Sequence, residues 1–246
     1  MIELEFESKR GFIYGDESMK KLLKIPDLKY KILKSERIQN ITVSTFEILK
    51  FESLQCTRDL LEISEIKCKH GVSINQKSTH RLPQEGWQEL IDCWSCHDHE
   101  FNSMLDLKIK PRLGGILLSN FYMIADPQLI PKCCFTENKI FYNEITSSLS
   151  HNFYIYKFFE EYFAMKSIIV LSLEDKKYEI KLFYWCNLIK KDNSPAFKVG
   201  FRESDRQNDE DTFIGEFFKK LILNQLKENA IGITLLKYNL SFITLQ

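Results

Sequence analysis

The sequence of 246 residues has no excess of charge of either sign. Lysine plus arginine and aspartate plus glutamate number 34 each, so the formal net charge is zero at pH 7. Proteins that bind nucleic acid usually show a basic excess, because contacts with phosphates supply much of their affinity. The overall charge balance therefore gives no reason to expect direct binding of nucleic acid.

The sequence also lacks segments suited to export or to a membrane. Residues 1–7 alternate acids with apolar residues, where a signal peptide needs a basic start followed by an apolar run. The longest mostly apolar stretch, residues 116–125, is about half of the roughly 20 residues that cross a bilayer. We therefore expect no membrane segment and a chain that stays inside the cell.

Familiar catalytic motifs are missing as well. We find no Ser-His-Asp arrangement, phosphate-binding glycine loop or His-Glu-x-x-His motif, which argues against a hydrolase or a nucleotide-dependent enzyme. The seven cysteines are an odd number. In a cytosolic or nuclear protein this favours reduced thiols or metal ligands over a disulfide framework.

One window, residues 81–101, is unusually specialised. It holds two of the three tryptophans, two of the seven cysteines and two of the five histidines. Pro83 suits the first turn of a helix. An apolar face at i, i+3, i+4 and i+7 follows, formed by Trp87, Leu90, Ile91 and Trp94. We predict a helix whose tryptophans are buried against a sheet.

The end of that helix carries Cys93 and Cys96, spaced as Cys-x-x-Cys. This spacing lets two thiolates reach one tetrahedral ion at about 2.3 Å from each sulfur. Upstream, Cys68 and His70 offer a second pair of donors beside a glycine. We predict one zinc site, held by Cys68, Cys96 and two of His70, Cys93 and His97. The alternative is that Cys93 is a small buried residue of the helix and His97 is solvated.

Two further features have simpler interpretations. Cys133 and Cys134 are adjacent and cannot form an unstrained disulfide with each other, so we favour a buried structural role over a catalytic or metal-binding one. The aromatic residues of 153–163 are interleaved with only one base, Lys157, and therefore indicate a core more than a surface that stacks nucleobases.

The pattern Leu-Pro-x-Glu-x-Trp-x-Glu-Leu-x-x-x-Trp-x-Cys-His, from Leu82 to His97, resembles the signature of the HECT-like E2-binding family of ubiquitin ligases. Residues 68–71 and 114–124 show looser similarity. The resemblance implies ubiquitin-ligase activity and an E2 ubiquitin-conjugating enzyme as partner. Fungal members are tied to pre-mRNA cleavage and polyadenylation, which implies a subunit of that machinery as a second partner and a location in nucleus and cytoplasm.

A ligase that transfers ubiquitin through its own thiol needs an exposed cysteine of lowered pKa, usually beside a histidine. Cys96, next to His97, is the candidate nucleophile. A thiolate inside a closed four-ligand zinc site is not available for this chemistry, however. The alternative function is a non-catalytic, zinc-stabilised binding module or chaperone for an E2 or for the cleavage and polyadenylation endonuclease.

The hydrophobic patterns predict an α+β fold, with β-rich mixed sheets, a few packed helices and a zinc-stapled hairpin and helix element. We expect one domain over residues 1–246, with a possible division near 127–150 into a zinc-containing part (1–126) and a C-terminal α/β part (150–246). Lysines within residues 20–34 should form a solvated face. We predict strands at residues 2–6, 41–51, 58–66, 72–74, 116–124, 168–173, 178–189, 197–201 and 231–245, and a helix from 209 to about 226. Residues 2–6, in which acids alternate with apolar residues, should bury one face, and 41–51 should be a central strand. Residues 168–189 should form a hairpin around a charged turn.

Overall fold

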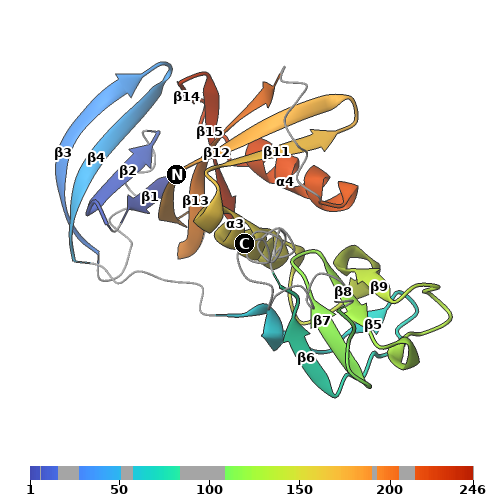
Figure 1. Cartoon of the computed structure of the whole chain (residues 1–246). Coiled ribbons are helices and arrows are strands. Elements are labelled where there is room, and N and C mark those ends of the chain that lie inside the picture. Colours follow the sequence, from blue (N-terminus) through green and yellow to red (C-terminus); the bar gives the residue numbers. More distant parts are fainter. Residues whose placement is uncertain are drawn as a thin grey trace, which may run out of the picture. The chain divides into compact units, whose positions relative to one another are not determined.

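A computed structural model describes residues 1–5, 7–15, 28–50, 58–83, 109–189, 193–204 and 214–245. The predicted helix after Pro83, including Trp87, Trp94, Cys93, Cys96 and His97, lies outside these residues. The chain divides into two compact units: unit 1 comprises Met1–Thr57 and Ile155–Gln246, and unit 2 comprises Arg58–Tyr154. Both are rich in strands, and the described residues include two α-helices (Figure 1), which confirms the predicted α+β, β-rich class.

Unit 1 is built on a nine-stranded sheet with the order β14-β15-β13-β12-β1-β2-β4-β3, and β11 pairs with β12. All of its pairings are antiparallel. The strands are β1 (Ile2–Glu5), β2 (Arg10–Tyr14), β3 (Lys29–Ile38), β4 (Ile41–Lys50), β11 (Ile168–Leu173), β12 (Lys176–Ile189), β13 (Asn193–Ser204), β14 (Thr234–Leu235) and β15 (Tyr238–Thr244). Helix α4 (Glu216–Glu228) belongs to unit 1, and α3 (His151–Met165) begins in unit 2 and continues into unit 1.

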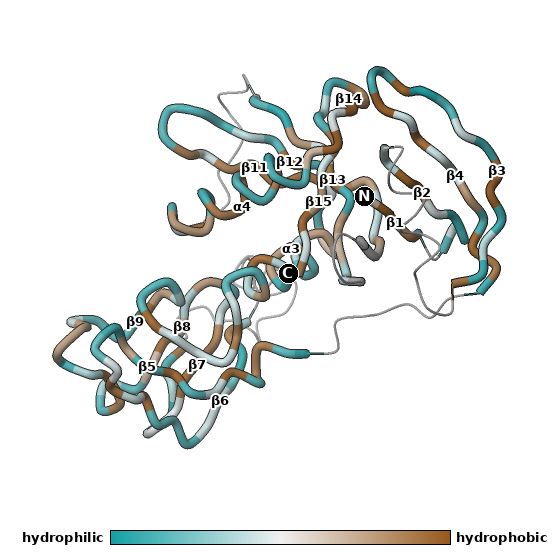
Figure 2. Tube along the Cα trace, turned by 180° about the vertical axis from the view of Figure 1, so that it is seen from behind, coloured by the Kyte–Doolittle hydropathy of each residue, from teal (hydrophilic) through white to brown (hydrophobic). Residues whose placement is uncertain are grey.

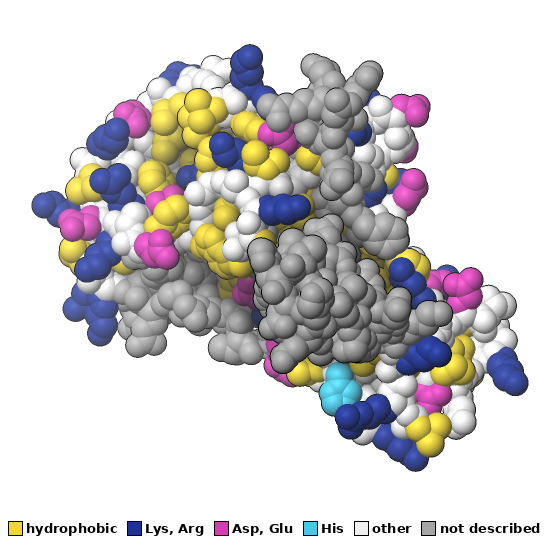
Figure 3. All heavy atoms as spheres, viewed as in Figure 1, with side chains coloured by type: hydrophobic (Ala, Val, Ile, Leu, Met, Phe, Trp, Pro, Cys, Tyr) yellow, Lys and Arg dark blue, Asp and Glu magenta, His cyan; other side chains and the backbone are white. Residues whose placement is uncertain are grey.

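Several predicted elements of unit 1 are confirmed. The hairpin predicted around a charged turn is β11–β12, and the strand predicted at 41–51 is β4, which is paired on both sides but next to the end of the sheet. Lys29, Lys31 and Lys34 on β3 are exposed, as expected of a solvated face. Figure 2 shows hydrophilic and hydrophobic residues alternating along β3 and β4, and Figure 3 shows basic side chains gathered over these strands.

Three predictions for unit 1 need correction. The segment 231–245 is a hairpin, β14–β15, because Leu236 and Lys237 take positive φ values of 50° and 69° and turn the chain. The strand predicted at 197–201 is longer, since β13 pairs along most of β12. The predicted helix 209–226 is confirmed from Glu216 onward as α4, but Ile214 and the N-cap residue Gly215 are not helical, and the predicted start near 209 lies outside the described residues.

Strand β1 was expected to bury one face, and this is wrong: Glu3 is fully buried and Glu5 is 9% exposed. The alternation of acids and apolar residues does not place the acids in water, because Tyr14 and Lys198 lie against the face that carries them. The Glu3 carboxylate instead accepts a hydrogen bond from Tyr14 Oη at 2.5 Å and pairs with Lys198 Nζ at 3.0 Å. Burial of the two acids in this strand is therefore offset by Tyr14 on the adjacent β2 and by Lys198 on β13, which also lies 3.7 Å from Glu5.

A second buried acid, Glu179, lies on β12. It is 2% exposed, accepts a hydrogen bond from Tyr238 Oη, and pairs with Arg202 Nη2 at 2.8 Å. The Arg202 guanidinium also lies 4.5 Å from the centre of the Tyr238 ring. This group of three side chains joins β12, β13 and β15 across the sheet.

Unit 2 contains a four-stranded sheet, in the order β6-β7-β8-β9, and a separate pair, β5 and β10. Strands β6 and β7 are parallel, and the other pairings are antiparallel. The strands are β5 (Lys67–Cys68), β6 (Ser78–Arg81), β7 (Gly115–Leu118), β8 (Tyr122–Ala125), β9 (Lys139–Phe141) and β10 (Ile145–Thr146). Among the described residues of unit 2, the 3₁₀ turn η1 (Leu60–Glu62) precedes β5, η3 (Pro127–Leu129) lies between β8 and β9, and η4 (Tyr142–Glu144) lies between β9 and β10.

Three strand predictions in unit 2 also need correction. Residues 58–66 begin with η1, because Asp59 caps a 3₁₀ turn, and residues 72–74 contribute only an isolated bridge between Ser73 and Lys67. The apolar stretch 116–124 is confirmed as buried β-structure but forms two strands. Its polar interruption is the turn of the β7–β8 hairpin, where Ser119 N donates to Tyr122 O at 2.9 Å.

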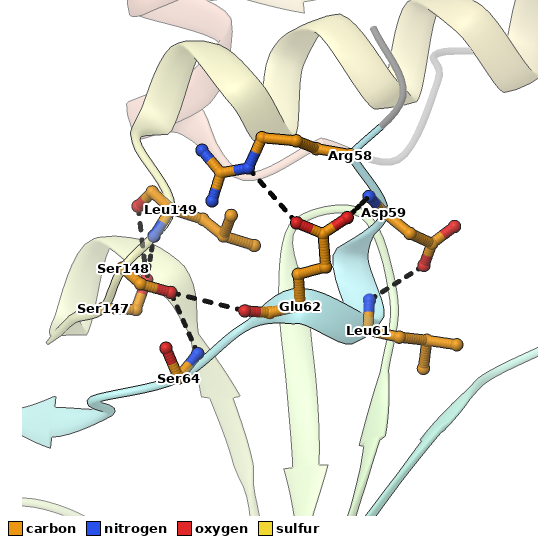
Figure 4. Close-up of polar contacts among 8 residues, drawn as sticks. All are labelled: Arg58, Asp59, Leu61, Glu62, Ser64, Ser147, Ser148 and Leu149. Atoms are coloured by element: carbon orange, nitrogen blue, oxygen red, sulfur yellow. Dashed lines mark hydrogen bonds and ion pairs between the residues drawn. The ribbon is translucent and has the colours of Figure 1, made fainter.

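Polar contacts hold the beginning of unit 2 against a segment near its end (Figure 4). Ser64 N donates to Ser148 Oγ and Ser148 N donates to Ser64 O, both at 3.0 Å. The Glu62 carboxylate accepts from Asp59 N at 2.8 Å and completes the cap of η1. These contacts place β5 beside β10, where Cys68 is paired with Ile145. Neither described helix has the length and apolar character needed to span a membrane.

Candidate metal centre

A tight turn after β5 presents Cys68 and His70. Gly71 N donates to Cys68 O at 2.8 Å, and Cys68 N donates to Val72 O at 2.9 Å. Gly71 has a φ of 79°, in the left-handed region that glycine adopts without strain. The glycine therefore lets the chain reverse directly after the two potential ligands.

A second turn, which follows η3, presents Cys133 and Cys134. Pro131 O accepts hydrogen bonds from Cys134 N at 3.0 Å and from Phe135 N at 3.3 Å. Two turns that are distant in sequence thus each offer two potential ligands.

These two turns meet at their side chains. The donor atoms of Cys68, His70, Cys133 and Cys134 all lie within 4.8 Å of one another. His70 Nδ1 is 3.0 Å from Cys134 Sγ, and Cys133 Sγ is 3.6 Å from Cys134 Sγ. Two sulfurs bound tetrahedrally at 2.3 Å would be about 3.8 Å apart. Three thiols and one imidazole at these separations fit a four-coordinate metal ion.

The four residues differ in their access to solvent. Cys68 is 2% exposed, Cys134 is partly buried, and His70 and Cys133 are exposed. The centre therefore lies at the surface of unit 2 and has one buried ligand.

The surroundings of Cys68 favour its thiolate. Desolvation raises its pKa, but the Cys134 thiol and the backbone N–H groups of His70 and Val72 lower it, and the net direction is downward. Desolvation, followed by interaction with Cys68 and Cys133, raises the pKa of Cys134 to about 11. A metal ion that binds here must displace the protons that remain on the thiols.

The region that contains the cluster matches a known protein family. A family model described as HECT-like ubiquitin-conjugating enzyme (E2)-binding matches residues 25–152, just over half of the chain. The chain belongs to this HECT-like E2-binding family. The match includes all four residues of the cluster and the window 81–101. Neither the curated proteins nor the solved structures contain a match.

Family membership confirms the resemblance drawn from Leu82 to His97, while the predicted site residues have different outcomes. Cys68 and His70 are brought together in the cluster. Cys93, Cys96 and His97 lie outside the described residues, so their part in the zinc site, and that of Cys96 in catalysis, stays a prediction.

From the sequence alone, Cys133 and Cys134 were not expected to be ligands. A buried role was expected, and for Cys133 this is wrong because its side chain is exposed. The available signal was a pair of cysteines shortly after a proline, in a turn between apolar strands.

Cys186, on β12 of unit 1, is 6% exposed, and burial raises its pKa well above the ordinary value. It is therefore a poor candidate for a reactive thiol.

Proposed function

We propose that this chain binds an E2 ubiquitin-conjugating enzyme, and that one zinc ion, held by Cys68, His70, Cys133 and Cys134, stabilises unit 2 for that purpose. The observation that carries the E2 partner is the match of residues 25–152 to an E2-binding family. The grouping of four donors within 4.8 Å, inside the same matched region, supports the metal.

Zinc is the metal that this set of donors suits best. Thiolates select soft or borderline ions, and three cysteines with one histidine are a common structural zinc set. Three thiolates and Zn²⁺ carry a net charge of −1. Lys67, Lys69 and Lys132, each adjacent to a ligand in sequence, provide positive charge near it. With four protein ligands the ion would support the fold and leave no open position for substrate.

A zinc site completed by these four residues has a consequence for Cys96. That cysteine is then not needed as a ligand, so its thiol can serve as the nucleophile of a ubiquitin ligase. Ubiquitin transfer through Cys96 is therefore the second function that we propose, beside simple positioning of a charged E2. A role in pre-mRNA 3′-end processing remains a prediction from the resemblance.

Metal content and E2 binding test the first proposal together. We expect about one zinc per chain by elemental analysis of protein prepared without chelator. His70→Ala should lower the zinc content, the melting temperature and the affinity for an E2 found by calorimetry across a panel of purified E2s. His80→Ala is the matched control, because His80 is an exposed histidine of unit 2 outside the cluster. Full E2 affinity in zinc-free protein would refute the role of the metal.

A thioester assay separates the two proposed activities. With E1, ubiquitin and a charged E2, transfer through Cys96 requires an adduct on this protein that reducing agent removes and that Cys96→Ser abolishes. Positioning alone predicts faster discharge of the E2 without such an adduct. An adduct that persists in Cys96→Ser would exclude Cys96 as the nucleophile.

A further inference from the structure

The three thiols of the candidate metal centre are unequal in a way that suits controlled oxidation. Cys133 is exposed, at the tip of the turn that begins at Pro131. Cys68, in the opposite turn after β5, is only 2% exposed. An oxidant that arrives from solvent therefore meets the exposed Cys133 before the buried Cys68.

We propose that this centre is an oxidation-sensitive switch, in which a peroxide oxidises Cys133, Cys68 closes a disulfide onto it, and zinc is released. The proposal rests on the zinc site put forward above and concerns its regulation. Exposed thiolates with an accessible partner thiol are the ones that oxidants select.

The chemistry balances with hydrogen peroxide as the oxidant. The Cys133 thiolate attacks one peroxide oxygen, the O–O bond breaks, and a sulfenic acid and hydroxide result. The Cys68 thiolate then attacks the Cys133 sulfur, an S–S bond forms, and a second hydroxide leaves. Two solvent protons convert the hydroxides to water. The two thiolates together lose two electrons, and the peroxide gains them.

The geometry selects Cys68 as the partner of Cys133. Cys134 Sγ is only 3.6 Å from Cys133 Sγ, but a disulfide between adjacent residues is strained because the bridge needs Cα atoms about 5.5 Å apart. Cys68 belongs to the opposite turn, and its sulfur lies within 4.8 Å of Cys133 Sγ. A modest approach of the two turns therefore suffices to join them.

The product would keep the two turns linked while it loses the metal. His70 and Cys134 are the two donors that remain, and two ligands are too few to retain the ion against solvent. The disulfide replaces a four-point attachment by a single covalent bond. We expect unit 2 to stay folded after oxidation and to recover its zinc site on reduction.

The test uses zinc-loaded full-length protein and hydrogen peroxide. A chromophoric zinc chelator should report release of about one zinc per chain, and peptide mapping should find a Cys68–Cys133 disulfide. In the unmodified sequence, trapping with dimedone should label Cys133 before any other cysteine of the centre. Cys133→Ser, loaded with zinc, should release it roughly tenfold more slowly, whereas Cys186→Ser, in unit 1, should match wild type.

Several results would overturn the proposal. These are first labelling of Cys68, a Cys133–Cys134 disulfide as the main product, or retention of zinc after the cysteines are oxidised. The dimedone experiment needs no variant, so it decides the order even if Cys133→Ser fails to bind zinc. Because neither zinc release nor mapping depends on an E2, a protein that binds zinc but no E2 would refute the proposed function and leave this test intact.

Discussion

Glu3 allows a quantitative prediction about pH and stability. Its side chain is fully buried on β1, and while Oε2 is bonded to Tyr14 and Lys198, Oε1 is buried without a hydrogen-bond partner. Desolvation is the largest influence and raises its pKa from 4.5 to about 7, although Lys198 and Tyr14 act in the opposite direction. The folded protein therefore binds this proton more tightly than the unfolded chain does.

The sign and size of the effect follow from linkage. Between pH 4.5 and 7 Glu3 is protonated in the folded state and ionised in the unfolded state, so stability falls as the pH rises through this window. At about 1.4 kcal/mol per pKa unit, the rise to about 7 corresponds to about 3 kcal/mol, with the full loss present above pH 7. Below pH 4.5 the contribution of Glu3 no longer changes.

The test compares wild type with Glu3→Gln by urea unfolding at several pH values from 5 to 8. A glutamine side chain resembles the protonated acid, so the two proteins should have similar stability at pH 5, and the variant should be more stable by about 3 kcal/mol at pH 8. Glu47→Gln is the control, because Glu47 is an exposed acid of the same sheet. An identical pH dependence in wild type and Glu3→Gln would refute the reasoning.

Three further predictions concern the same two units. Glu179→Gln should lower the free energy of unfolding in urea by about 2 to 3 kcal/mol, because it removes the buried charge partner of the partly exposed Arg202. The control is Glu203→Gln, which breaks an exposed pair with Lys176 and should lower it by less than about 1 kcal/mol. Gly200→Ala should lower stability by roughly 1 to 3 kcal/mol, because an added Cβ would lie 2.4 Å from the Phe183 ring and 2.6 Å from Tyr238; an unchanged melting temperature would contradict the packing. A zinc chelator should increase hydrogen exchange in β5 and β10 but not in β12 and β13, as measured by mass spectrometry. Exchange in β5 and β10 that the chelator leaves unchanged would contradict a structural metal.

Sequence patterns were reliable where the deciding interactions are local. The charged turn between β11 and β12 and the apolar stripe of α4 lie within single segments, and both elements were found. The pattern of β1 misled because the side chains that lie against Glu3 are distant in sequence, above all Lys198, which follows it by most of the chain. No periodicity in residues 2–6 could reveal that partner.

The metal centre likewise combines residues that a local pattern reveals with residues that only the fold brings near. Cys68 and His70 stand out because they are separated by one residue and followed by a glycine. Cys133 and Cys134 join them only because β5 pairs with β10 and η3 leads into the second turn. A family signature identified the chain from Leu82 to His97, whereas the described part of the site is formed by residues on either side of that signature.

Unit 1 is formed by two separate segments of the chain, and this has a consequence for its synthesis. Strand β1 pairs with β12 through Ile2 and Ile189, so all of unit 2 is translated between the two halves of the sheet. At about 5 to 20 residues per second, the segment 58–154 takes roughly 5 to 20 seconds to emerge. Because unit 2 is a single uninterrupted segment, it can fold during that time. Until β12 is synthesised, the edge of β1 that pairs with it stays unpaired. Charged residues on an unpaired strand edge oppose aggregation, so Glu3 and Glu5 should protect the nascent chain from it. They should do so although Glu3 lowers the stability of the folded protein. In cell-free translation, Glu3→Gln should therefore yield more aggregate than wild type, despite its greater stability at pH 8.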